Sequence, residues 1–150
     1  MYITIRPLAS EDFNQWKVLF EGYCDFYEHP ADETKVLTEW NWLHDEKNML
    51  KGLVACDAVG NIMAFAHYHA WPISIFGSEV CYLSDLYTLP SYRKKGAAKA
   101  LYNHLIDLCK ENSWPALTLL TQENNTTAQS LYNQFGEASD FKFYISPIAS

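Results

Sequence analysis

The hydrophobic residues of the chain follow two different periods, and each period predicts a different kind of element. Residues 2–6 alternate apolar and polar side chains up to Pro7, which predicts a short strand. Beyond Ser10, which offers an N-cap, apolar residues recur at steps of three and four as far as residues 29–30, which predicts a helix. This helical stripe consists of Phe13, Trp16, Phe20, Tyr23 and Tyr27. Residues 32–44 predict a second helix.

The middle of the chain predicts three successive strands. Residues 52–56, 62–71 and 79–89 are rich in strand-forming residues, and turn sequences separate them. A loop over residues 90–96 then leads into a helix that ends before residues 114–115, where Trp-Pro stops it. The middle of the chain thus changes from the period of a strand to the period of a helix.

The last third predicts a short strand, a helix and a final strand. Residues 116–121 are apolar, Asn125 or Thr126 caps the helix, and the last strand is marked by alternating apolar residues at Phe141, Phe143 and Ile145. The element order is therefore β-α-α-β-β-β-α-β-α-β. That order predicts an α/β fold with a mixed sheet and helices on its faces.

Composition narrows the class of protein. A chain of 150 residues, 49% of them hydrophobic, fits a single domain over residues 1–150 with its own core. No apolar run approaches the ~18 residues that cross a membrane, and the first residues lack a signal-peptide pattern, so we expect a cytoplasmic protein. The net charge of −7 disfavours nucleic acid as a partner, because nucleic-acid binders neutralise phosphates with basic patches.

The charge is unevenly distributed along the chain. Residues 1–46 contain ten acidic and three basic residues, which already accounts for the whole net charge. The remaining residues balance, but four bases gather in one short stretch: Arg93, Lys94, Lys95 and Lys99. The four cysteines form no CxxC pair, and the five histidines show no metal-binding spacing, so no metal site is expected.

The basic loop, residues 93–98, leads into a predicted helix, and this combination favours binding of an anion. The first N–H groups of a helix have no acceptor within it, and the helix dipole places partial positive charge there. Gly96 allows the backbone to approach a phosphate, while Ala97 and Ala98 keep large side chains away. The spacing fits neither a P-loop nor a dinucleotide-binding glycine motif. A solvated turn is the alternative interpretation.

The basic loop resembles the pyrophosphate loop of the GNAT superfamily of N-acetyltransferases, whose pattern is Gln/Arg-x-x-Gly-x-Gly/Ala. Residues 83–92 resemble the fourth strand and following turn of that family, and residues 125–132 resemble its Asn-x-x-Ala-x-x-x-Tyr helix. With the opening residues 3–7, these matches stand in the family's order across nearly the whole chain. Residues 121–132 and the aromatic first helix further resemble the subgroup of histone, polyamine and D-amino-acid acetyltransferases.

The resemblance implies a mostly antiparallel sheet and acetyl-coenzyme A (acetyl-CoA) as the co-substrate. Backbone N–H groups of the basic loop would hold the pyrophosphate, and the pantetheine arm would lie along the fourth strand. The residues implied in donor binding are Leu86, Tyr87, Thr88, Arg93, Lys94, Lys95, Gly96, Ala97, Ala98, Asn125 and Tyr132.

The resemblance also implies direct transfer of the acetyl group from the thioester to an amine. Tyr132 stands where the family has the acid that protonates the leaving thiolate, and core packing is the alternative for this residue. Some relatives carry a glutamate as the base where this chain has Ser84. Asp85 is the nearest carboxylate, but adjacent residues of a strand point to opposite faces, so the sequence assigns no base.

Tyr27, Glu28 and Asp85 are the candidate acceptor-binding residues. The acidic first helices would concentrate a cation, which favours a small cationic amine, polyamine-like or in a basic peptide, as the acceptor. One alternative is an amino-acid acetyltransferase, including one for D-amino acids, which must hold a carboxylate although Arg6 is the only arginine outside the basic loop. The other alternative is a non-catalytic module that binds acyl-CoA, and a homodimer is left open.

Overall fold

A computed structural model describes residues 2–149 of the chain. The chain divides into two compact units, Met1–Leu120 and Thr121–Ser150, which we call the first and the second unit. The first unit contains the sheet and three of the predicted helices, and the second unit contains the fourth helix.

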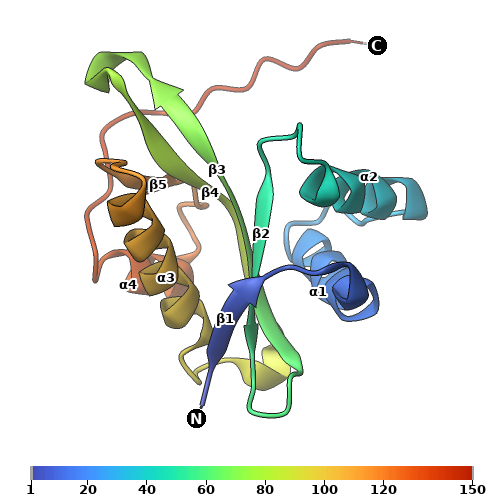
Figure 1. Ribbon diagram of the computed structural model, residues 1–150. Helices are drawn as coiled ribbons and strands as arrows, with labels where there is room; N and C mark the ends of the chain where they lie inside the picture. The colour runs from blue at the N-terminus through green and yellow to red at the C-terminus, as the bar shows by residue number, and fades with distance from the viewer. Residues whose placement is uncertain (1, 150) are drawn as a thin grey trace. The chain divides into compact units, whose positions relative to one another are not determined.

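The first unit is built on a five-stranded sheet with the strand order β1-β2-β3-β4-β5 (Figure 1). The strands are β1 (Thr4–Pro7), β2 (Lys51–Cys56), β3 (Ile62–Ile73), β4 (Ser78–Thr88) and β5 (Leu117–Leu119). The first four strands pair antiparallel in sequence order, whereas β5 pairs parallel with β4. The predicted mixed, mostly antiparallel sheet is therefore confirmed.

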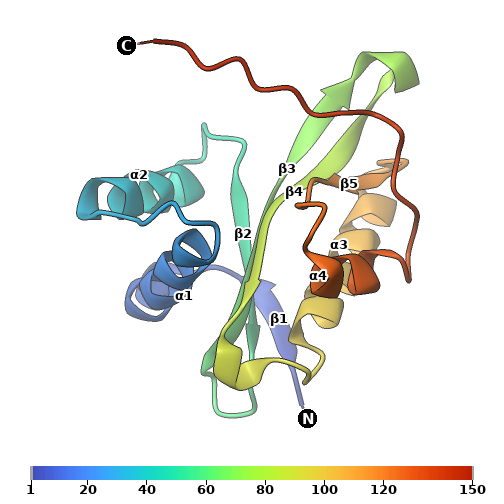
Figure 2. The ribbon, with the colours of Figure 1, turned by 180° about the vertical axis from the view of Figure 1, so that it is seen from behind.

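Helices cover both faces of this sheet, because each helix has one apolar stripe to bury. The helices α1 (Phe13–Phe26) and α2 (Glu33–His44) lie on one face, and α3 (Ala97–Glu111) lies on the other (Figures 1 and 2). Since both faces are covered, β3 is buried without alternation from Ile62 to His67. The core against α1 and α2 includes Trp16, Leu19, Phe20, Val54 and Phe65.

The first helix begins later than its sequence suggested. Ser10 opens a short 3-10 turn, Ser10–Asp12, and α1 follows from Phe13. The buried carboxylate of Asp12 accepts hydrogen bonds from the Ala9 N–H at 2.8 Å and from the Arg6 guanidinium at 2.7 and 2.9 Å. The expected cap at Ser10 is thus wrong, because the Asp12 carboxylate holds this turn and is itself tied to β1.

The second unit contains α4 (Thr126–Tyr132), whose predicted cap is confirmed. The Asn125 side-chain oxygen accepts a hydrogen bond from the Ala128 N–H at 3.2 Å. The final strand expected at Phe141, Phe143 and Ile145 is not formed: residues 137–149 contain no strand, and these three side chains are exposed. An alternating pattern makes a strand compatible with a sequence, but a strand forms only where a second backbone pairs with it.

None of the helices within residues 2–149 combines the length and the apolar character that crossing a membrane would require.

Candidate functional site

The basic loop has the backbone shape of an anion-binding turn. Lys94 has φ +63° and Gly96 has φ +90°, both in the left-handed region, and such turns direct successive N–H groups into a concavity. The helix α3 begins at Ala97, and a hydrogen bond of 3.0 Å runs from the Ala100 N–H to the Gly96 carbonyl. The N–H groups of the first turn therefore have no acceptor within the helix.

Gly96 is required by its backbone conformation and not by lack of space. A Cβ atom there would meet only the Ile3 Cδ1 atom, at 4.0 Å, but a φ of +90° strains any residue that carries one. Arg93 fixes the other end of the loop, since its Nε donates to the Thr88 carbonyl at 3.2 Å and its guanidinium lies 5.6 Å from the centre of the Tyr87 ring. The loop is thus held between the end of β4 and the start of α3.

The strand β4 presents one open edge beside this loop. It pairs with β3 as far as Thr88, but β5 pairs only with Cys81–Leu83. From Ser84 onward, no strand of the described chain pairs with the second edge of β4. This edge includes the backbone of Leu86, Tyr87 and Thr88, and an extended ligand can bind to such an edge as an added strand.

A β-bulge at Ser84 changes which side chains of β4 face α1. His67 pairs with Asp85 and Tyr68 pairs with Leu83, so Ser84 is an extra residue in the ladder. The Ser84 hydroxyl lies 3.2 Å from the Asp85 Oδ2 atom, so these adjacent side chains meet. Our expectation that neighbouring residues point apart is therefore wrong at this place, because the bulge interrupts the alternation on which it rested.

The bulge also places Tyr87 against α1. The Tyr87 ring packs edge-on against Tyr23 of α1, with ring centres 6.2 Å apart. A Cβ atom on Gly22 would come within 2.5 Å of the Tyr87 hydroxyl oxygen, so any larger residue at position 22 would displace the Tyr87 ring. Asp85 and Tyr87 consequently share the face of β4 that α1 covers.

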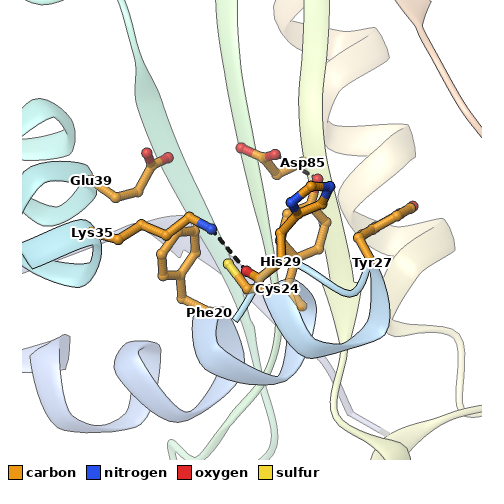
Figure 3. A pocket seen from close by; sticks show the side chains of 8 residues that line it. Phe20, Cys24, Tyr27, His29, Lys35, Glu39 and Asp85 are labelled. Atoms are coloured by element: carbon orange, nitrogen blue, oxygen red, sulfur yellow. Dashed lines mark hydrogen bonds between the residues drawn. The ribbon is translucent and has the colours of Figure 1, made fainter. Parts of the chain in front are cut away.

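A pocket of about 290 Å³ lies between α1, α2 and β4 (Figure 3). We call it the aromatic pocket; its lining residues are Phe20, Tyr23, Cys24, Tyr27, His29, Lys35, Glu39 and Asp85. Three aromatic rings and two carboxylates face the same space, with one lysine at its side. Such a mixture suits a small organic ligand that carries charge.

Asp85 is the most strongly hydrogen-bonded group of the aromatic pocket. Its Oδ1 accepts from the Tyr23 hydroxyl at 2.6 Å, and its Oδ2 accepts from the His67 Nδ1 at 2.9 Å. The Ser84 hydroxyl shares its proton between this Oδ2 at 3.2 Å and the His67 carbonyl at 3.1 Å. Burial opposes the negative charge, but these hydrogen bonds outweigh it and hold the pKa of Asp85 below its usual range. Burial, together with the charge of Asp85, raises the pKa of the Tyr23 hydroxyl. The pocket therefore contains a fixed carboxylate beside a phenol that keeps its proton.

His67 lies beneath the pocket and links α1, α2 and β4. Its ring is fully buried, its Nδ1 lies 3.4 Å from the Glu39 Oε1 atom, and its Nε2 accepts a hydrogen bond of 3.0 Å from the Trp16 indole. Burial disfavours a charged ring, but the hydrogen bonds and charges of Asp85 and Glu39 outweigh this effect and raise the pKa of His67. His69, two residues along β3, instead lies within 2.9 Å of the Ala70 carbonyl through its Nδ1.

Lys35 supplies a positive charge to the same pocket. Its ammonium group donates to the backbone carbonyl of His29 at 2.8 Å, as Figure 3 shows, and it forms no ion pair with a carboxylate of the described residues. The aromatic pocket therefore contains groups that suit both an ammonium and a carboxylate.

The structure brings together only part of the predicted acceptor site. Tyr27 and Asp85 both line the aromatic pocket, whereas Glu28 is exposed, has φ +59° and is not among the lining residues, and acceptor binding by these residues stays a prediction. Glu39, Lys35 and His67 were missed as site residues. Glu39 stands one position before a tryptophan on α2, and its sequence surroundings distinguish it in no way from the other acids of the first 46 residues.

Asn125 and Tyr132 belong to the second unit. Asn125 caps α4, and Tyr132 is the last residue of that helix and is half-buried. Their predicted contacts with the donor remain predictions from the resemblance.

Residues 16–136 match the acetyltransferase (GNAT) family. A D-amino-acid N-acetyltransferase of Saccharomyces cerevisiae is 27% identical over 143 residues, which cover 95% of this chain and 89% of that protein. An uncharacterized N-acetyltransferase of Bacillus subtilis is 26% identical and covers 94% of this chain and 93% of its own. A crystal structure of a ribosomal-protein-alanine N-acetyltransferase from Brucella melitensis shares the fold, with a TM-score of 0.84, 24% identity and coverage of 98% of this chain and 100% of that one.

Proposed function

The chain belongs to the acetyltransferase (GNAT) family of acetyl-CoA-dependent N-acetyltransferases, and we propose that it acetylates a primary amine on a small cationic acceptor. The observation that carries this proposal is the pair of carboxylates, Asp85 and Glu39, in the aromatic pocket. An ammonium group in that pocket would meet two anions and three aromatic rings, all of which attract cations.

The donor side of the proposal rests on the backbone. The left-handed turn at Lys94 and Gly96 suits the pyrophosphate of acetyl-CoA, and the open edge of β4 at Leu86–Thr88 suits its pantetheine arm. Arg93, Lys95, Ala97 and Ala98 would surround the phosphates. Few side chains need to contact the donor in this arrangement, which agrees with the exposed lysines in the loop.

The acceptor side must bring a neutral amine to the thioester. An alkyl ammonium has a pKa of about 10 and gives up a proton before it attacks, whereas a second ammonium on the same molecule can stay charged. Asp85, held ionised by three donors, suits the charged group. Glu39 has its described contact only with His67, and its remaining lone pairs suit the proton that is lost. Tyr132 would protonate the leaving thiolate.

A second candidate acceptor is an amino acid, and one observation favours it. Lys35 lies in the aromatic pocket, and within residues 2–149 a backbone carbonyl is the only hydrogen-bond partner of its ammonium group, so this group can bind a carboxylate. The S. cerevisiae relative carries the name of a D-amino-acid N-acetyltransferase. In this alternative, Asp85 and Glu39 would face the α-amino group and Lys35 the α-carboxylate.

Release of free coenzyme A over a panel of acceptors tests the proposal. We expect polyamines and basic peptides to be acetylated with higher kcat/KM than monoamines, and expect Asp85→Asn to reduce that preference, whereas Glu39→Gln should lower kcat for every acceptor. Activity on D- or L-amino acids that Lys35→Met removes would support the second candidate instead. Calorimetric binding of acetyl-CoA without thiol release from any acceptor would contradict both and indicate a binding module.

The assigned acid has its own test. If Tyr132 protonates the thiolate, Tyr132→Phe lowers kcat by about 10²-fold or more while the acetyl-CoA dissociation constant is unchanged. Full activity of this variant would exclude that role.

A further inference from the structure

A cluster of three ligand-type groups, with His67 buried and Glu39 and Asp85 half-buried, lies at the base of the aromatic pocket. One atom from each of Glu39, His67 and Asp85 lies within 4.8 Å of the other two. Two carboxylates and an imidazole are a set that binds divalent metal ions in many proteins. The kind of ligand that this cluster can bind depends on which nitrogen of His67 carries a proton. The Trp16 indole, which donates to the Nε2 of His67, controls that proton.

Three protonation states of His67 are available, and only one satisfies its neighbours. The Trp16 indole has an N–H and no acceptor, so the Nε2 of His67 must offer a lone pair at the 3.0 Å contact. A proton on Nε2 would place two N–H groups against each other. A ring without a proton on Nδ1 would turn a lone pair toward Asp85 and Glu39. The neutral ring with its proton on Nδ1 meets all three partners.

We propose that Trp16 is a positioning residue that fixes His67 as the Nδ1–H tautomer, so that the cluster binds the ammonium group of an acceptor and excludes divalent metal ions. A metal needs the Nδ1 lone pair, and the neutral ring can expose that lone pair only by moving its proton to Nε2, where Trp16 blocks it. With the proton on Nδ1, His67 orients Asp85 and leaves the outer oxygen lone pairs of both carboxylates toward the pocket.

Trp16 is held in place by its packing. Its side chain is fully buried, it stacks on Phe20 with ring centres 4.9 Å apart and planes 8° from parallel, and it contacts Trp40 at 5.1 Å between ring centres. Turning the indole away from His67 would disturb both contacts and leave a buried N–H without an acceptor, which is costly. The carboxylates of Asp85 and Glu39 favour a second proton on His67, and the rigid indole opposes it.

The tautomer can be measured on the protein without any acceptor. Long-range ¹H–¹⁵N correlation spectra of histidine-labelled protein distinguish the two neutral tautomers from the imidazolium. At neutral pH we expect His67 to carry its proton on Nδ1 alone, with His67→Gln assigning the signal. A proton on Nε2, with or without one on Nδ1, would overturn the proposal, whatever the acceptor proves to be.

Cobalt(II) tests the exclusion of metal. We expect the wild type to show no Co²⁺ absorption that His67→Gln removes, with His69→Gln as the matched control for that substitution. We expect Trp16→Phe to bind Co²⁺ at least tenfold more tightly than the wild type. Co²⁺ bound equally well by both proteins would contradict the proposal. Calorimetric binding of acetyl-CoA checks that Trp16→Phe is folded; if it is not, the wild-type spectra and the wild-type Co²⁺ titration still decide.

The choice of an ammonium group as the ligand rests on the proposed function, whereas the tautomer does not. If the spectra show the Nδ1–H form but the coenzyme A assay finds no amine acceptor, only the acceptor proposal fails. In an active enzyme, we expect Trp16→Phe to raise KM for the acceptor by about fivefold or more. Its kcat should change less, because Trp16 would act on acceptor binding through His67.

Discussion

The basic loop and the aromatic pocket are built from different parts of the polypeptide. The loop depends on consecutive backbone groups between β4 and α3, with left-handed residues at Lys94 and Gly96. The pocket depends on side chains from α1, α2 and β4, with His67 of β3 beneath it. Trp16 and His67, which meet at 3.0 Å, are 51 residues apart in the chain.

This difference determines how each region tolerates substitution. A site made of backbone N–H groups needs the right φ angles and open space, and it accepts many side chains at its variable positions. A site made of buried, mutually hydrogen-bonded side chains loses several contacts when one member changes. We therefore expect conservative changes to be severe in the pocket and mild in the loop, except at Gly96.

The largest effect is expected for Asp85→Asn. Removing a half-buried charge that accepts three hydrogen bonds should lower kcat/KM for a cationic acceptor by about 10²-fold, near the lower end of the 2–5 kcal/mol seen when one partner of a buried charge pair is removed. Steady-state kinetics measure it, with acetyl-CoA affinity expected to stay within threefold. Asp25→Asn, an exposed acid on α1, is the matched control. Equal losses in both variants would mean that the general field of the acidic helices, and not the pocket, attracts the acceptor.

A smaller effect is expected for Gly96→Ala in the loop. The left-handed φ costs a residue with a Cβ about 1–2 kcal/mol, so the acetyl-CoA dissociation constant should rise by about tenfold as the turn changes shape. Isothermal titration calorimetry measures it, and Gly60→Ala, at a left-handed glycine in the β2–β3 turn, controls for strain elsewhere. An unchanged donor affinity would show that the backbone of this turn does not bind the phosphates.

Asp85 should make the free energy of unfolding fall as the pH is lowered. The pKa of Asp85 is lower in the folded protein than its usual value of about 3.9, so its contribution is present above pH 4 and is lost as the pH falls through the folded value. Urea unfolding between pH 7 and pH 3 should show the stability difference between wild type and Asp85→Asn shrinking at the acid end. A difference that grows on acidification would mean that the carboxylate is destabilised in the fold.

The smallest effect is expected for Lys94→Gly. Glycine adopts the left-handed conformation without strain, so thermal unfolding should show a gain of up to about 1 kcal/mol. Loss of the exposed ammonium group should weaken acetyl-CoA binding by less than threefold. A tenfold loss would show that side-chain charge, and not backbone geometry, dominates this loop.

The same contrast explains what could be predicted from the sequence. The strands and helices from residue 4 to residue 132 follow from periodicity, caps and glycines, except that the first helix begins at Phe13 and not at the expected Ser10 cap. The basic loop is recognisable because all of its parts are consecutive. The strand expected at residues 137–149 failed because its pattern does not show whether a partner strand exists. Within the first 46 residues, only three-dimensional packing separates Glu39, which faces the pocket, from Glu28, which faces solvent.

The bulge at Ser84 gives β4 two phases. Before the bulge, Tyr82 packs with His69 and Trp71, and beyond it Tyr87 packs with Tyr23. The side chains on the face toward α1 therefore belong to even-numbered residues before Ser84 and to odd-numbered residues after it. Deleting one residue at this place would remove the bulge and restore strict alternation along β4. Asp85 and Tyr87 would then turn away from the pocket face, and the residues next to them in the sequence would take their place. A single extra residue in one strand therefore decides which side chains of β4 line the aromatic pocket.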